Sequence, residues 1–320
     1  PSGGDSNVSL EEGLKAVVPL YSIDEIQDKN HDKLVHLSGK LQTDMVLNDG
    51  EYGVAVKAVK LKRNVEMFQW VEHKSTKYLL KSYRVIYMSS IPYRENPRRT
   101  ARRGFIRNPT VITVTALPEY NEGDKTRVET SYSYDKQWKS SIVSSHQFDN
   151  PSGHQNPSSM PVSPYVKEAD PVNVGAFKIS KGLIRKIDEF QRLVAREIPT
   201  GKNIILQDGS FYHSNNPFNP QVGDVRVSFS YAGLSGKSGS ALGEPLTVSI
   251  VARQHGKTLT HYHTESGHSL ELLYPGELSA KEIFDAEHAA NTALTWILRG
   301  VGWIMLFLGF MLMTSILTTL

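Results

Sequence analysis

Residues 296–320 read WILRGVGWIMLFLGFMLMTSILTTL. From Gly300 to Leu320, twenty-one residues carry no charge, and about twenty apolar residues rising 1.5 Å each are enough to cross the hydrocarbon core of a membrane. In lipid, a helix satisfies its own backbone donors and acceptors. The stretch therefore predicts a transmembrane helix, which we place at residues 294–320. The alternative is a core helix of a soluble protein, although such helices rarely stay uncharged for so long.

Several residues of this predicted helix suit a membrane environment. Trp296 and Trp303 are candidate anchors at the membrane interface, where Arg299 could also extend its charge toward the headgroups. Gly302 and Gly309 fall on one helix face, where a neighbouring helix could approach closely, and Thr314 is available for an interhelical hydrogen bond. A lipid-facing position for both glycines is equally compatible with the sequence.

The roughly 290 residues before this helix have the composition of a globular domain. Alternation of apolar and polar residues predicts half-buried antiparallel strands at 33–41, 54–71, 129–138, 223–231 and 246–253. Capping-box pairs predict short helices at 9–18 and 279–288, apolar spacing predicts another at 182–194, and four prolines and four serines predict a loop at 150–164. The expected fold class is α+β: a β-rich domain with a few helices, followed by a transmembrane helix.

Charge divides the domain into parts. Residues 73–116 hold ten Lys or Arg against Glu95 alone, which is +9, so the rest of the chain carries −6 of the total +3. We therefore expect a first part of the domain at 1–72, a basic insertion foreign to the domain at 73–116, and a second part at 117–293. A translated intron or faulty gene model is one explanation of the insertion, and a real isoform loop is the other.

Candidate chemistry is sparse. With no cysteines, the chain has no disulfide, thiolate metal site or Cys nucleophile. His261 and His263 could form a metal or catalytic site with neighbours such as His255, although alternating His and Thr on an exposed strand edge is the plainer interpretation. Gly236-Lys237-Ser238 lacks the earlier glycine of a phosphate loop, so a glycine-rich hairpin loop at 232–243 is the better interpretation. Asn7 begins the one glycosylation sequon.

Several stretches together resemble the transmembrane protein 43 family, also called LUMA. They are Val65–Glu72, Tyr132–Tyr134 through Trp138, His154–Ser158, Phe211–Ser214 through Gly223–Asp224, Val227–Gly236 and Val251–Gln254. The resemblance runs from about Ser9 to Leu320. The basic segment 73–116 has no counterpart in the family pattern, and the chain resembles the large domain and one later span of that family.

The resemblance implies a protein of the inner nuclear membrane and endoplasmic reticulum whose large domain lies in the lumen. It implies a scaffold that maintains nuclear envelope structure by organising membrane protein complexes, with emerin, lamins and its own copies as partners. It implies no enzymatic activity, cofactor or catalytic residue, and we expect no nucleic-acid binding. The alternatives are a membrane-tethered luminal enzyme or metal-binding domain at His261 and His263, or a conductance-related membrane subunit.

Overall fold

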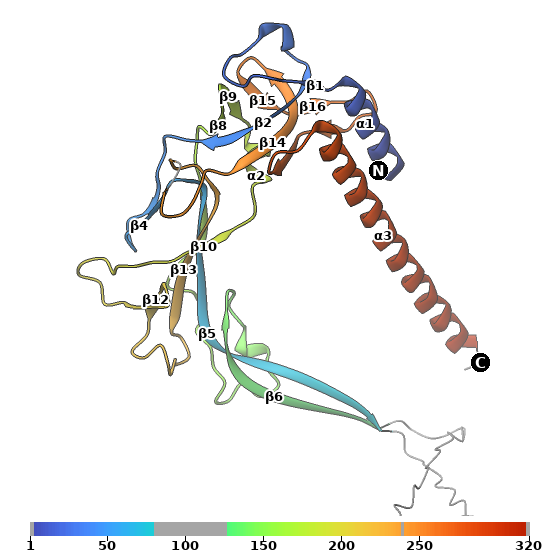
Figure 1. The fold of residues 1–320 in the computed structure, drawn as a ribbon. Coiled ribbons are helices and arrows are strands. Elements are labelled where there is room, and N and C mark those ends of the chain that lie inside the picture. The colour runs from blue at the N-terminus through green and yellow to red at the C-terminus, as the bar shows by residue number, and fades with distance from the viewer. Residues whose placement is uncertain (1–2, 80–126, 238–239, 318–320) are drawn as a thin grey trace, which may run out of the picture. The chain divides into compact units, whose positions relative to one another are not determined.

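The computed structural model describes residues 3–79, 127–237 and 240–317, and these form two compact units. The larger unit comprises residues 1–69, 138–142 and 157–320, and the smaller one comprises residues 70–137 and 143–156. Figure 1 shows the ribbon, coloured from blue at the N-terminus to red at the C-terminus.

The first sheet of the larger unit follows the order β1 (Val18–Pro19), β2 (Leu34–Gln42), β8 (Asn173–Val174), β9 (Phe177–Ile179), β15 (Thr258–Thr260), β14 (Thr247–His255) and β18 (Leu272–Pro275). An additional antiparallel pairing of β2 with β14 closes the circuit β2-β8-β9-β15-β14. Closure gives most of these strands a partner on both sides, which removes exposed edges. Two short antiparallel pairs form separate two-stranded sheets: β3 (Leu47–Asp49) with β4 (Val54–Val56), and β16 (Tyr262–His263) with β17 (Ser269–Leu270).

The second sheet follows the order β11 (Ile205–Gln207), β12 (Ser210–His213), β13 (Val225–Leu234), β5 (Ala58–Leu79) and β6 (Arg127–Lys139). β10 (Gln191–Leu193) also pairs with β13, and β7 (Tyr165–Glu168) pairs with β5. Val225, Val227 and Phe229 are buried and their neighbours Arg226 and Ser228 are less so, as the predicted alternation requires. The predicted strands at 33–41, 129–138, 223–231 and 246–253 are thus confirmed, with small shifts in their ends. The strand predicted at 54–71 is divided at Lys57 into β4, which pairs with β3, and β5, which belongs to the second sheet and continues to Leu79.

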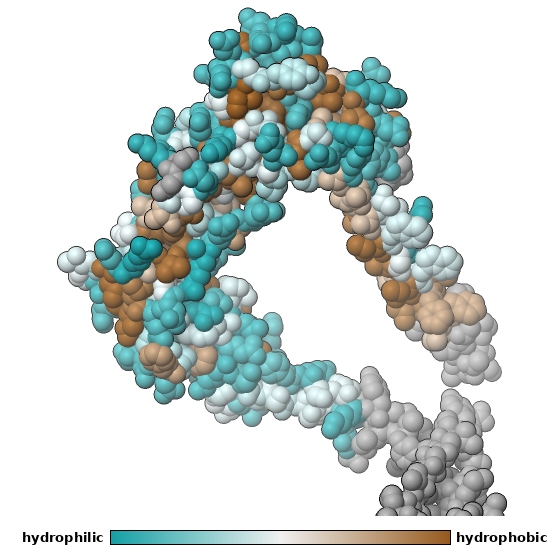
Figure 2. All heavy atoms as spheres, viewed as in Figure 1, coloured by the Kyte–Doolittle hydropathy of each residue, from teal (hydrophilic) through white to brown (hydrophobic). Residues whose placement is uncertain are grey.

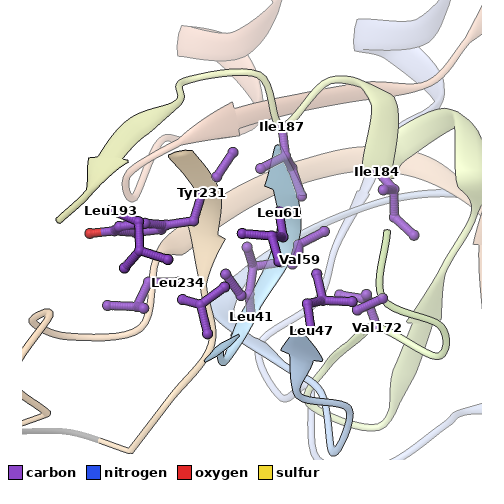
Figure 3. Packing of buried hydrophobic residues seen from close by; sticks show 14 of the residues in the cluster. Leu41, Leu47, Val59, Leu61, Val172, Ile184, Ile187, Leu193, Tyr231 and Leu234 are labelled. Carbon is purple, nitrogen blue, oxygen red and sulfur yellow. The ribbon is translucent and has the colours of Figure 1, made fainter. Parts of the chain in front are cut away.

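One large hydrophobic core joins the two sheets of the larger unit. Figure 3 shows its centre, where Leu41 of β2 lies among Val59 and Leu61 of β5 and Leu234 of β13. Each strand contributes every second residue to this core. Because the strands come from distant parts of the chain, the core joins segments that are far apart in the sequence. The predicted loop at 150–164 is confirmed, and two short 3-10 helices lie at Asp28–Asn30 and Ser145–Gln147.

The smaller unit contains the outer part of β5, most of β6 and a loop that packs on them. The Tyr134 and His154 rings stack with centroids 3.8 Å apart, and Asn156 Nδ2 donates to the carbonyl oxygens of Trp70 and Val143. β5 continues to Leu79, across the boundary expected between residues 72 and 73. The rest of the predicted insertion, residues 80–116, lies outside the described residues.

The described helices are α1 (Gly3–Ala16), α2 (Lys181–Arg185) and α3 (Ala280–Leu317). The prediction of one helix over 182–194 is wrong, because α2 is a single short helix and the chain then extends into β10. Leu183, Ile184 and Leu193 are buried as expected, but Val194 is 55% exposed. Apolar spacing did not distinguish one helix from a helical turn followed by a strand.

Two other local expectations are corrected by the fold. Ser9 does not cap α1, which begins at Gly3; instead Ser9 is buried in mid-helix, where its Oγ shares hydrogen bonds with Thr264 Oγ1 (3.1 Å) and Ser266 Oγ (2.5 Å). The predicted hairpin loop at 232–243 is wrong, because residues 232–234 belong to β13, and β13 and β14 belong to different sheets. The connection that begins at Ser235 is therefore not a hairpin turn. It is a crossover between the sheets, held where Leu246 N donates to Leu234 O (2.8 Å).

Candidate membrane-anchoring site

The candidate functional site is α3, the one helix of the described residues long and apolar enough to cross a membrane. Ser279 caps it, since Glu282 N donates to Ser279 Oγ (3.2 Å), which confirms the helix start predicted at Ser279. Ile283 and Phe284 in its first turns are fully buried. From Leu294 to Met311 its large apolar side chains are more than half exposed, and Figure 2 shows hydrophobic residues gathered along this part. A continuous exposed apolar surface of this kind requires lipid or another apolar partner around it.

The base of α3 is fastened by a second hydrophobic core. Its members are Leu10, Leu34, Val251, Leu270, Leu272, Ile283 and Phe284, drawn from α1, the first sheet, β17 and α3. At Gly13 of α1, an added Cβ would lie 2.4 Å from Leu270 Cδ1 and 3.0 Å from Phe284 Cε1. Only a residue without a side chain therefore allows α1 to lie this close to the start of α3.

Hydrogen bonds extend the attachment along α3. His36 Nε2 donates to Leu278 O (2.7 Å), Tyr274 OH donates to Glu287 Oε1 (2.5 Å), and Asn291 Nδ2 donates to Ser6 Oγ (2.9 Å). Burial, followed by the hydrogen bond to the Glu287 carboxylate, raises the pKa of Tyr274 well above its ordinary value. The phenol is protonated at physiological pH, as an ordinary tyrosine is, and donates this bond. These contacts reach Asn291, three residues before the exposed apolar part begins.

The residues predicted to meet the membrane lie in that exposed part. Trp296 and Trp303 are 66% and 74% exposed, and the Arg299 guanidinium lies 5.6 Å from the centre of the Trp296 ring. No heavy atom lies within 4 Å of a Cβ built on Gly302 or Gly309, so both positions are open to a neighbouring helix or to lipid. Thr314 belongs to α3, but its side chain is not among those that the structure describes.

The histidines singled out in the sequence separate into two places. The His261 and His263 rings are neighbours, with centroids 4.7 Å apart, and His261 Nδ1 lies 3.9 Å from Glu271 Oε2. His255 lies elsewhere, with Nδ1 3.1 Å from Asp32 Oδ1, and Asp32 Oδ2 lies 3.3 Å from His31 Nε2.

Within the described residues, His31, Asp32 and His255 are the only trio with metal-ligand atoms close together. All three are exposed, and the Gly256 N–H donates to His31 Nδ1 (3.1 Å). An imidazole that accepts this bond at Nδ1 carries its proton on Nε2, the atom facing Asp32. A metal bound to Nε2 would move that proton to Nδ1, and the hydrogen bond from Gly256 would then be lost. His261 and His263 are not part of such a trio.

Sequence reasoning missed a buried ionic cluster in the larger unit. Asp49 accepts from Arg63 Nε (2.8 Å), from Arg63 Nη2 (2.5 Å) and from the Tyr165 hydroxyl. Burial opposes ionisation of Asp49, but the hydrogen bonds from Tyr165 and Arg63 outweigh it and hold the pKa of Asp49 below its usual value. The sequence contained a signal for this cluster, because Arg63 occupies an inward-facing position in the alternation of β5, between buried Leu61 and Val65.

These features define a class of protein: a strand-rich membrane protein whose core packs on the start of a continuous helix able to span a membrane. A family model described as transmembrane protein 43 matches residues 115–320. The chain is 41% identical over 313 residues to transmembrane protein 43 of Mus musculus and 40% identical to that of Homo sapiens. These alignments cover 98% of this chain and 68% of each relative.

A more distant relative, the transmembrane protein 43 homolog of Drosophila melanogaster, is 32% identical over 318 residues, covering 98% of this chain and 71% of the relative. The chain belongs to the transmembrane protein 43 family. No solved structure matches it.

Proposed function

We propose that this protein is a membrane scaffold of the inner nuclear membrane and endoplasmic reticulum. Its β-rich domain lies in the lumen and helps to maintain nuclear envelope structure by organising membrane protein complexes. Its partners are further copies of itself, emerin and lamins, and it acts without catalysis or a cofactor. Membership of the transmembrane protein 43 family and the resemblance of its motifs support this proposal.

One observation carries the proposal: α3 is continuous from the hydrophobic core of the domain into its exposed apolar part. Ile283 and Phe284 are fully buried, and only about one and a half turns separate Asn291 from Trp296. The domain therefore cannot rotate freely on its anchor. A scaffold benefits from this rigidity because partners bound to the domain are held in a fixed orientation relative to the lipid.

The competing classes receive less support. An enzyme or metal-binding domain would use His261 and His263. Of these, His261 lies near Glu271, which also accepts a hydrogen bond from Ser180 Oγ (2.8 Å), and His263 Nδ1 lies 3.2 Å from Ser269 Oγ. A conductance-related subunit would need polar groups along its membrane path. In the described part of the span, residues 294–311, Arg299 is the only charged residue, and it lies near one end.

The test alters the connection between domain and span. A flexible Gly-Ser linker of seven residues is inserted between Ala293 and Leu294, and the control receives seven helix-forming residues there, which add about two turns and nearly preserve orientation. Co-purification of emerin and of a second tagged copy from cell membranes is measured for both. We expect the flexible insertion to reduce capture and the helical one to retain it. Equal capture by both variants would contradict the rigid-scaffold proposal.

A further inference from the structure

A polar pocket of about 450 Å³ lies beside the crossover that joins the two sheets. It is lined by the end of β2 and the residues after it, by Lys57 before β5, by Asn173 of β8, and by Ser235, Gly236, Lys237 and Pro245 of the crossover. The volume falls within the range of about 300–1,000 Å³ that is usual for small-molecule sites. The pocket lies in the larger unit, and its lining does not include Asp49 or Arg63 of the buried cluster.

The charges around this pocket favour an anion. Lys40, Lys57 and Lys237 line it against one carboxylate, that of Asp44. Lys40 also lies 3.4 Å from Glu244 Oε2, and both side chains are about half exposed, so this pair neutralises Lys40 weakly. Lys57 and Lys237 have no ion pair among the described residues, which leaves a local excess of positive charge.

Ser235 supplies an independent observation. It lines the pocket and is only 6% exposed, yet its Oγ has no hydrogen-bond partner within the described part of the chain. A buried hydroxyl without a partner is costly, and most buried polar groups in proteins are satisfied. The backbone of Ser235 is held in place, since its N–H donates to Lys57 O (3.0 Å). The residue is therefore held at the pocket wall, and no described group uses the donor capacity of its buried hydroxyl.

We propose that this pocket binds a phosphomonoester, that is, a small soluble molecule carrying a terminal phosphate group. Lys57 and Lys237 neutralise the phosphate, and Ser235 Oγ donates a hydrogen bond to one of its oxygens. Gly236 leaves space because it has no side chain, and the volume accommodates a short organic group beyond the phosphate. The site is not a nucleotide-hydrolysing phosphate loop, because β14 follows the crossover where that motif requires a helix.

The test uses the full chain in detergent micelles. Binding of glycerol 3-phosphate and of inorganic phosphate is measured by calorimetry and by the rise in melting temperature that a ligand of the folded state produces. Lys57→Met and Lys237→Met should each weaken binding about tenfold, as expected for the loss of one charge-assisted hydrogen bond. Asp44→Asn should tighten binding, and Lys202→Met, an exposed lysine outside the pocket, should leave it unchanged.

Ser235→Ala separates a binding role from a structural one. Without ligand this variant should melt no lower than the unaltered protein, because it removes an unsatisfied buried hydroxyl. With ligand, its rise in melting temperature should be smaller. The proposal is overturned if neither glycerol 3-phosphate nor inorganic phosphate binds. It is also overturned if Lys202→Met weakens binding as much as Lys57→Met or Lys237→Met does. Binding of dihexanoyl phosphatidic acid without binding of glycerol 3-phosphate overturns the soluble-ligand assignment and places a lipid headgroup in the pocket.

Discussion

Gly13 lies where α1 crosses the first turns of α3, and its missing side chain determines how closely the two helices pack. The neighbours that a Cβ would meet, Leu270 and Phe284, are 4% and 1% exposed, so neither can move aside into solvent. The absence of a Cβ at Gly13 therefore determines how closely α1 packs against the start of the membrane helix.

Gly13→Leu should destabilise the domain by about 1–3 kcal/mol, the usual cost of overpacking. Denaturant unfolding in micelles measures the loss. Gly50→Ala is the control, because a Cβ there meets no atom within 4 Å, and it should change stability little. A Gly13→Leu variant as stable as the control would mean that α1 does not pack on Leu270 and Phe284.

Asp49 and Arg63 form the other decisive contact at this scale. Their side chains are 1% and 10% exposed, so each depends on the other for its charge to be tolerated inside. Asp49→Asn should cost about 3 kcal/mol, because it leaves the Arg63 charge buried beside only the half-exposed Glu51. Combining Asp49→Asn with Arg63→Met should restore part of the loss, and a double-mutant cycle measures it.

The lowered pKa of Asp49 also predicts a dependence on pH. A carboxyl whose pKa is lower in the folded than in the unfolded state stabilises the fold above the unfolded pKa, about 3.9 for Asp. This stability is lost as pH falls from about that value through the folded pKa. Unfolding curves between pH 5 and about 2.5 should therefore show a steeper loss for the unaltered protein than for Asp49→Asn. Parallel curves would show that Asp49 does not contribute.

At the scale of elements, α3 is one helix with two environments. Its first turns are amphipathic and buried against the domain, whereas residues 294–311 expose apolar side chains all round. In lipid there is little hydrophobic drive between helices, so close approach at small residues and interhelical hydrogen bonds must supply any association. Gly302 and Gly309 are the open small residues on this part of α3 that lie on one face.

Replacing Gly302 and Gly309 together with Leu should lower self-association while membrane insertion persists, because Leu suits lipid as well as Gly does. Cross-linking of tagged copies in membranes measures the change. A control with Val301→Leu and Phe307→Leu alters apolar bulk at other exposed positions and should cross-link normally. Undiminished cross-linking of the glycine variant would place self-association outside this glycine face.

At the scale of the whole molecule, the proposed luminal position of the domain rests on family resemblance. The sequon at Asn7 adds nothing, because Asn7 lies within α1, its Oδ1 is buried, and Ser9 is only 1% exposed. Charges near the span are too balanced to orient it.

Protease treatment of sealed microsomes tests the orientation of the domain. With the domain in the lumen, residues 10–287 should survive digestion until detergent opens the vesicles. An intact luminal marker protein in the same sample is the control for sealing. Digestion of the domain in sealed vesicles would place it on the cytoplasmic side.

The sequence by itself determined the features that depend on neighbouring residues. The uncharged run after Arg299 predicts a span, the alternation through residues 54–71 and 223–231 predicts strands, and Ser279 predicts the start of α3. Each follows from local composition or period, because lipid solubility, pleating and helix capping act over a few residues.

Only the tertiary structure decided which residues meet across long separations. In it, Ser9 is a buried contact of Thr264 and not the expected cap, and Asp49 binds Arg63 and Tyr165. Lys40, Lys57 and Ser235 line one pocket. The tertiary structure also divided residues 182–194 between α2 and β10. The physical reason is that strand partners and core neighbours are chosen by the burial of whole faces, and a local pattern shows that a face is apolar without showing what will cover it.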